Sequence, residues 1–172
     1  AKTGGLRRSY WDWDEQLAAN KGGAFPYTPA TNLLYGLAEA IDMLHDEGLD
    51  NVFARHDRHA EATRRAVQAW GLEVLCQEPR DFSSSLTAVM MPDGVDADAF
   101  RAAVLKHFDM SLGNGLSRLA GRVFRIGHLG DFNDLMLTAT LSGVEKGLRV
   151  ADVPHQSGGV NAAMQYLAEN AA

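Results

Sequence analysis

The sequence predicts an α+β fold: a small, mostly antiparallel sheet with helices packed on one face, preceded by an extended arm and a helical hairpin. The spacing of apolar residues changes from three and four to two near residue 72, which marks a change from helices to strands. The predicted order is helix, helix, strand, strand, helix, strand, strand, helix, which is typical of an α+β layer. With 172 residues, 46% of them hydrophobic, the chain can bury a sizeable core.

The first 31 residues predict an arm with no stable element of its own. Gly22, Gly23, Pro26 and Pro29 interrupt it, and a residue before proline is disfavoured in a helix. The chain has no initiator methionine, which suggests that it begins partway through a longer protein. We therefore divide it into an interdomain or active-site arm, a C-terminal small α+β domain that includes the connecting helices, and a tail with a short helix. These three segments are 1–31, 32–150 and 151–172.

Two helices follow the arm. The first spans 32–47, with Asn32 as a candidate cap and an apolar stripe of Leu33, Leu37, Ile41 and Leu44. The second begins near Asp50 or Asn51 and ends at Trp70, before Gly71. Its stripe comprises Val52, His56, His59, Thr63, Val67 and Trp70.

The remaining elements alternate between strands and helices. Period-two patterns predict strands at 72–78 and 86–91, and Asp96 is a candidate cap for a helix over 97–108. Further elements are a short strand at 109–112, a strand at 122–126, a helix at 132–148 and a short helix near 160–169.

Charge and composition exclude several functions. Sixteen basic against 22 acidic residues give a net charge of −6, which argues against nucleic acid as a partner. No run of 18 apolar residues predicts a membrane span. The single cysteine, Cys76, cannot form an internal disulfide and fits a reducing, cytoplasmic compartment. We interpret Cys76 as a small buried hydrophobe, with a catalytic thiol as the alternative.

Two further patterns have a structural and a functional interpretation. His56 and His59 are three residues apart on one helix and can ligate a metal, but no third ligand is evident. We expect them to pack or hydrogen-bond, and we predict no metal site. The segment Gly113-Asn114-Gly115 resembles a phosphate loop but lacks its third glycine, so it predicts a turn, with a loop near a ligand as the alternative.

Arg125 is the strongest candidate for a binding residue. It lies between Phe124 and Ile126 in a predicted strand, so its side chain points to the face opposite theirs. A partly buried guanidinium needs an anion, and its planar fork fits a carboxylate through two hydrogen bonds. An internal salt bridge or a solvated strand face is the alternative.

A second candidate is Phe25-Pro26-Tyr27-Thr28-Pro29-Ala30-Thr31, directly before a helix. Hydroxyl and N–H groups beside a helix start can bind phosphate, and a loop with a cap is the alternative. No Gly-x-Ser-x-Gly motif indicates a serine hydrolase.

These motifs, in this order and separation, resemble the C-terminal part of class V, fold-type I aminotransferases that depend on pyridoxal phosphate, of the bacterial serine–glyoxylate type. The matching segments are Ser9-Tyr10-Trp11-Asp12-Trp13, Phe25 to Leu37, Gly48-Leu49-Asp50-Asn51-Val52 and Arg125-Ile126-Gly127-His128-Leu129-Gly130.

The resemblance implies a role for three positions. Arg125 matches the arginine that binds the substrate α-carboxylate, and Thr28 matches a threonine that reaches the cofactor phosphate of the other subunit of a homodimer. Phe25 stands where relatives often carry a phosphate-binding tyrosine, and it lacks that hydroxyl. The resemblance also implies amino-acid and 2-oxo-acid substrates, with transfer of an amino group from serine or alanine to glyoxylate.

The same resemblance places the Schiff-base lysine in a cofactor domain before residue 1, and Lys2 does not match it. We therefore identify no catalytic residue in this chain and expect the chain alone to be inactive. The alternative function is a non-catalytic α+β module for dimerisation or for binding a small carboxylate. In either case we expect an exposed apolar helix face that favours self-association.

Overall fold

The computed structural model describes residues 3–6 and 9–171, so Lys2 lies outside the described residues. The chain forms two compact units, Ala1–Gly48 and Leu49–Ala172. Within the described residues, no helix combines the length and the apolar character that crossing a membrane requires.

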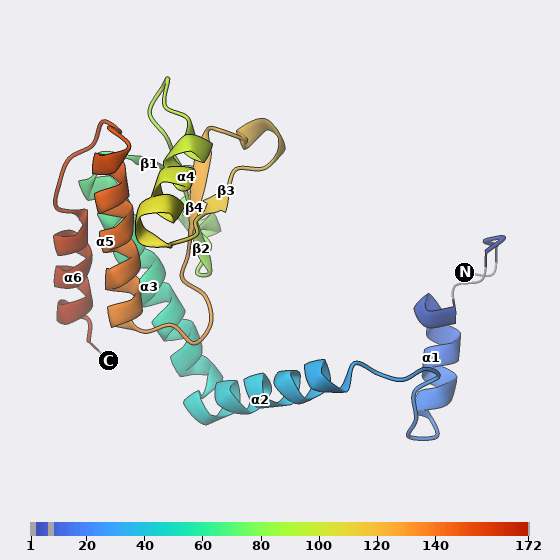
Figure 1. Cartoon of the computed structure of the whole chain (residues 1–172). Coiled ribbons are helices and arrows are strands. Elements are labelled where there is room, and N and C mark those ends of the chain that lie inside the picture. Colours follow the sequence, from blue (N-terminus) through green and yellow to red (C-terminus); the bar gives the residue numbers. More distant parts are fainter. Residues whose placement is uncertain (1–2, 7–8, 172) are drawn as a thin grey trace. The chain divides into compact units, whose positions relative to one another are not determined.

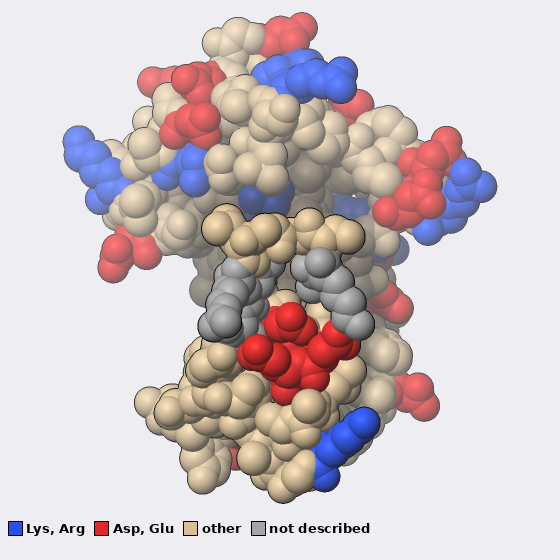
Figure 2. Space-filling view, turned by 90° about the vertical axis from the view of Figure 1, so that its right-hand side faces the viewer, with Lys and Arg blue, Asp and Glu red and all other residues tan. Residues whose placement is uncertain are grey.

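The N-terminal unit contains a helix that the sequence analysis did not predict. After a short 3-10 turn (Ser9–Trp11), helix α1 spans Trp13–Asn20, inside the segment expected to be extended. The Asp12 carboxylate caps it by accepting from the Asp14 backbone N–H at 2.9 Å. Asp14 and Glu15 then place negative charge in the first turn, where the helix dipole favours it. Figure 2 shows acidic side chains gathered on this unit.

Helix α2 spans Thr31–Glu47 and begins one residue earlier than predicted. Ala30 occupies the N-cap position without a side-chain hydrogen bond, so the prediction that Asn32 caps this helix is wrong. The predicted stripe is present, but it is not buried in the described chain: the side chain of Leu33 is 75% exposed, and Leu37 is 56% exposed.

The C-terminal unit holds a four-stranded sheet and four α-helices among its described residues, which confirms the predicted fold class. The elements are α3 (Leu49–Ala69), β1 (Glu73–Val74), β2 (Leu86–Met90), α4 (Ala97–Phe108), β3 (Gly113–Asn114), β4 (Val123–Gly127), α5 (Asp134–Val150) and α6 (Gly159–Glu169). The strand order is β1-β2-β4-β3, and each neighbouring pair is antiparallel.

Helix α4 has the predicted bounds, and Asp96 caps it through the backbone N–H groups of Asp98 and Ala99. The strand predicted at 109–112 is wrong. Asp109 adopts a left-handed conformation (φ 51°) that ends α4, and pairing with β4 begins only at Gly113.

The register of β2 and β4 decides which side chains enter the core. Val89 pairs with Phe124 and Thr87 with Ile126, and all four side chains are buried on the face that the helices cover. The rings of Phe100 in α4 and Phe124 lie 4.8 Å apart. Because side chains alternate along a strand, the residues between these pairs face the other side of the sheet.

The long helices α3, α5 and α6 lie side by side on one side of the sheet (Figure 1). Trp70, just after α3, is fully buried, and its indole Nε1 donates to Glu145 of α5 at 2.8 Å. The Glu145 carboxylate also accepts from the backbone N–H groups of Gly158 and Val160, at 3.1 and 3.0 Å. This one side chain therefore joins three helices and caps α6.

Gly159 sits where α6 contacts the indole of Trp70. A Cβ at this position would overlap the ring and would lie 2.7 Å from the backbone oxygen of Ala66. We expect Gly159→Ala to lower the free energy of unfolding by about 2 kcal/mol, the typical cost of overpacking. Urea denaturation checks this, with Gly127→Ala as the control because its Cβ would meet open space. Equal stability of both variants would contradict the prediction.

Candidate functional site

Arg125 lies in the middle of β4, on the sheet face that the core helices leave uncovered. It pairs with Ala88 of β2 and with Gly113 of β3, so its neighbours across both strands are small. The side chain is half-buried, and its Nε is buried without a hydrogen-bond partner. Among the described residues, no carboxylate forms an ion pair with this guanidinium. The guanidinium of Arg125 therefore carries a positive charge and N–H donors that no described residue accepts from.

The loop after β4 is held against α3 by two adjacent side chains. Arg55 Nη1 donates to the backbone oxygens of Gly130 and Phe132, at 2.8 and 3.0 Å. His56 accepts from the Gly130 N–H at Nε2 (3.0 Å) and lies 2.7 Å from the Val52 oxygen through Nδ1. Because Nε2 accepts and Nδ1 faces a carbonyl oxygen, these two contacts fit the tautomer that carries its proton on Nδ1.

The same helix also holds the start of α5. Arg58 donates to both carboxylate oxygens of Asp134, at 2.8 and 2.7 Å, and His59 Nε2 lies 2.8 Å from Oδ1. The Arg58 guanidinium is the main reason that the pKa of Asp134 lies below its usual value. Burial lowers the pKa of His59, although its hydrogen bond to Asp134 opposes the change. His56 and His59 thus form hydrogen bonds, as expected from the sequence.

His128 fixes the end of β4 from the buried side of the sheet. Its imidazole is fully buried, Nε2 lies 3.0 Å from the Thr87 hydroxyl, and its backbone N–H donates to Ser85 at 3.1 Å. Burial lowers the pKa of His128 to about 4, so the ring is neutral at pH 7. The segment after Arg125 is therefore fixed at His128, Gly130 and Asp134.

Phe25 and Thr28 belong to the N-terminal unit, whereas Arg125 belongs to the C-terminal unit. The structure brings the segment around Phe25 to the one around Tyr10: the Tyr10 and Tyr27 rings lie 6.3 Å apart, and the Tyr27 hydroxyl donates to Glu15 at 3.2 Å. The two segments line a pocket of about 280 Å³ that includes the half-exposed Phe25 ring. Thr28 is exposed, and no described residue hydrogen-bonds to its hydroxyl.

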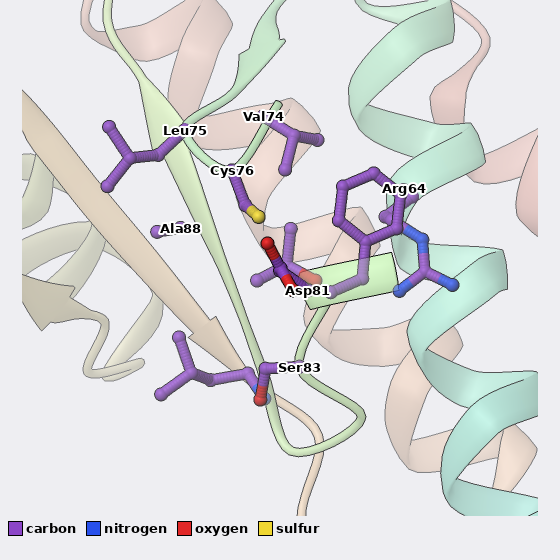
Figure 3. Close-up of a pocket in the computed structure, with 10 residues that line it drawn as sticks. Arg64, Val74, Leu75, Cys76, Asp81, Ser83 and Ala88 are labelled. Atoms are coloured by element: carbon purple, nitrogen blue, oxygen red, sulfur yellow. The ribbon is translucent and has the colours of Figure 1, made fainter. Parts of the chain in front are cut away.

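Cys76 is not fully buried, unlike the small hydrophobe expected from the sequence. Its side chain is half-exposed in a pocket of about 250 Å³ between the sheet and α3, together with Arg64 and Asp81 (Figure 3). The thiol lies 3.6 Å from the Glu78 backbone oxygen. Arg64 is engaged by Glu61 and by the Phe82 ring, so this pocket offers an anion little free charge.

Stability should depend on His128 in mild acid. A pKa of about 4 in the folded state lies below the unfolded value near 6.5, so the unfolded state binds the proton more readily. The contribution of neutral His128 to the free energy of unfolding is complete above pH 6.5. It is lost as the pH falls toward 4, by up to roughly 3 kcal/mol. Urea denaturation between pH 7 and pH 4 checks this. We expect His128→Gln to flatten that dependence and His107→Gln, at an exposed histidine, to keep it.

Comparisons with known proteins find aminotransferases that are similar to this chain. No family model matches the chain. A serine–glyoxylate aminotransferase of Methylorubrum extorquens is 48% identical over 170 residues, which are 96% of this chain and 41% of that protein. A serine–glyoxylate aminotransferase of Arabidopsis thaliana is 44% identical over 168 residues, or 96% and 42%. The chain therefore spans about two fifths of the length of these relatives.

Solved structures show the same fold. A ureidoglycine–glyoxylate aminotransferase from Bacillus subtilis matches with a TM-score of 0.86 and 26% identity, over 98% of this chain and 44% of that one. A pyridoxamine–pyruvate aminotransferase from Mesorhizobium loti matches with a TM-score of 0.80 and 33% identity, over 86% and 38%. Sequence and fold agree, and the chain belongs to the class V, fold-type I aminotransferases.

Proposed function

We propose that this chain is the substrate-carboxylate-binding part of an aminotransferase that transfers an amino group from serine or alanine to glyoxylate. The observation that carries the proposal is the Arg125 guanidinium, which is half-buried, without a described partner, and on the exposed face of the sheet. The names of the serine–glyoxylate relatives support the choice of donor and acceptor. They also favour this function over a non-catalytic dimerisation or carboxylate-binding module.

Arg125 is suited to bind both substrates in turn, because a donor amino acid and glyoxylate share a carboxylate. Its two terminal nitrogens can donate two parallel hydrogen bonds to that group, which fixes the plane of the substrate as well as its position. Such positioning removes much of the orientational freedom that a reaction must otherwise overcome. The loop held by Arg55 and His56 keeps the end of β4 in place while substrates exchange.

Pyridoxal phosphate is the cofactor that this family implies. Thr28 fits one part of it, because an exposed hydroxyl with no described partner can donate to a phosphate oxygen. Phe25 offers no such donor. The bound cofactor supplies the electron sink for bond cleavage at the substrate α-carbon. Thr28 would hold a phosphate oxygen of the cofactor, and Arg125 would hold the carboxylate of the substrate.

We further propose a homodimer in the cytoplasm. The homodimer rests on the family role of Thr28, which reaches the cofactor of the other subunit. The cytoplasmic location rests on the presence of one cysteine, which leaves no internal disulfide to be maintained.

Loss of the guanidinium should weaken binding of both substrates. In the complete aminotransferase that carries this sequence, we expect Arg125→Ala to raise the KM for serine and for glyoxylate by about 100-fold, equivalent to about 3 kcal/mol of charged hydrogen bonding. Arg125→Lys should fall between this variant and the parent protein, because an ammonium cannot bind a carboxylate through a planar fork. Steady-state kinetics with each substrate check the prediction.

Arg149→Ala is the matched control, since it removes the same charge from an exposed position at the end of α5. Unchanged KM values in Arg125→Ala would refute the assigned role.

The two positions in the arm should affect the cofactor, not the substrate. We expect Thr28→Val, which removes only the hydroxyl, to weaken pyridoxal phosphate binding about tenfold. Phe25→Tyr should tighten it, because it adds the donor that relatives carry there. Titration of cofactor-free protein, followed by absorbance, measures both. A change in the serine KM at saturating cofactor, without a change in cofactor affinity, would contradict this assignment.

A further inference from the structure

The side chain of Arg125 lies directly across Gly113 of the neighbouring edge strand. The two residues are register partners in the β3–β4 pair. A Cβ placed on Gly113 would stand 3.0 Å from Arg125 Cβ, 3.0 Å from Nε and 3.5 Å from Cζ. The arginine chain thus occupies the space that any other residue at position 113 would fill.

Backbone conformation does not explain this glycine. Gly113 lies in a paired strand and has no positive φ, so alanine would meet no backbone strain there. Gly115 is different, because a Cβ there would overlap the backbone oxygen of Leu119. The two glycines of the predicted turn therefore differ: Gly113 makes room for a side chain, and Gly115 makes room for the main chain.

Contact with β3 also determines where Arg125 can bond. Its Nε is buried without a partner, whereas Nη1 and Nη2 are not among the buried atoms that lack a partner. With Nε enclosed, the terminal nitrogens are the part of the fork that remains for an anion. A methyl group at position 113 would push the chain off this path by some tenths of an ångström and would turn the plane of the fork.

We propose that Gly113 is a positioning residue for Arg125: the missing side chain on the edge strand sets the direction in which the guanidinium presents its terminal nitrogens to the substrate carboxylate. The proposal rests on the proposed function of Arg125. It assigns the edge strand β3 a part in substrate binding beyond completing the sheet.

The test is Gly113→Ala in the complete aminotransferase, with Asn114→Ala as the matched control. Asn114 is the adjacent residue of β3, is exposed, and alternates to the other face of the strand. We expect Gly113→Ala to raise the KM for both serine and glyoxylate about tenfold, with kcat changed less than the KM, because displacing a binding group by fractions of an ångström weakens orientation. Asn114→Ala should leave both KM values unchanged.

A second readout needs no cofactor and no turnover. In the 172-residue chain, the Nε–H resonance of Arg125 is followed by NMR during titration with acetate. We expect the resonance to move in the parent chain, and the apparent Kd to rise about tenfold in Gly113→Ala. Thermal unfolding of each variant shows whether the fold is retained.

The outcomes separate this inference from the proposed function. If Arg125→Ala raises the KM but Gly113→Ala changes neither the KM nor the acetate titration, the positioning role is wrong and the function stands. If Gly113→Ala lowers only kcat or stability, the glycine is structural and the inference is overturned. If Arg125→Ala itself has no effect, the assignment of Arg125 fails, and the role of Gly113 fails with it.

Discussion

The alternation of side chains along β4 is the constraint on which the candidate site depends. Phe124 and Ile126 are fully buried between the sheet and the helices, so Arg125 must project from the opposite face. A shift of one residue in the register would place the guanidinium in the core and both apolar side chains outside. Such a register is unfavourable because it buries an unpaired charge and exposes two large apolar groups. The hydrophobic core therefore determines where the charge lies, without any contact to a ligand.

Helix α3 carries much of the polar framework that surrounds this strand. Arg55 and His56 bond to the backbone of the loop after β4, and Arg58 and the fully buried His59 bond to the Asp134 carboxylate. Each of these hydrogen bonds joins residues about 75 positions apart in the sequence, so the contacts exist only in the folded unit. Because these residues are consecutive or nearly so on one helix, the position of α3 sets the position of the whole loop.

Sequence patterns predicted the larger elements well because long amphipathic segments repeat their signal over several turns, as in α4 and α5. Helix α1 was missed because its eight residues have little apolar periodicity, and the Asp12 cap was the one available signal. Strand β3 was misplaced because two residues cannot show a period of two. Arg125 was found from its apolar neighbours, whereas Gly113 could not be, since its importance depends on a cross-strand pairing that local sequence does not encode.

Helix α6 closes the core, although it lies far along the chain from the residues that it covers. Glu145 and the first turn of α6 cover Trp70, although α6 begins about 90 residues later in the sequence, at Gly159. Contacts that join such distant parts of a polypeptide carry a large loop-closure entropy, and they form slowly. During translation, the contacts between α3 and α6 can therefore form only after the residues from Gly159 to Glu169 have been synthesised. Until then, the face of α3 that packs against α6 remains exposed, and exposed apolar surface on a nascent chain favours aggregation.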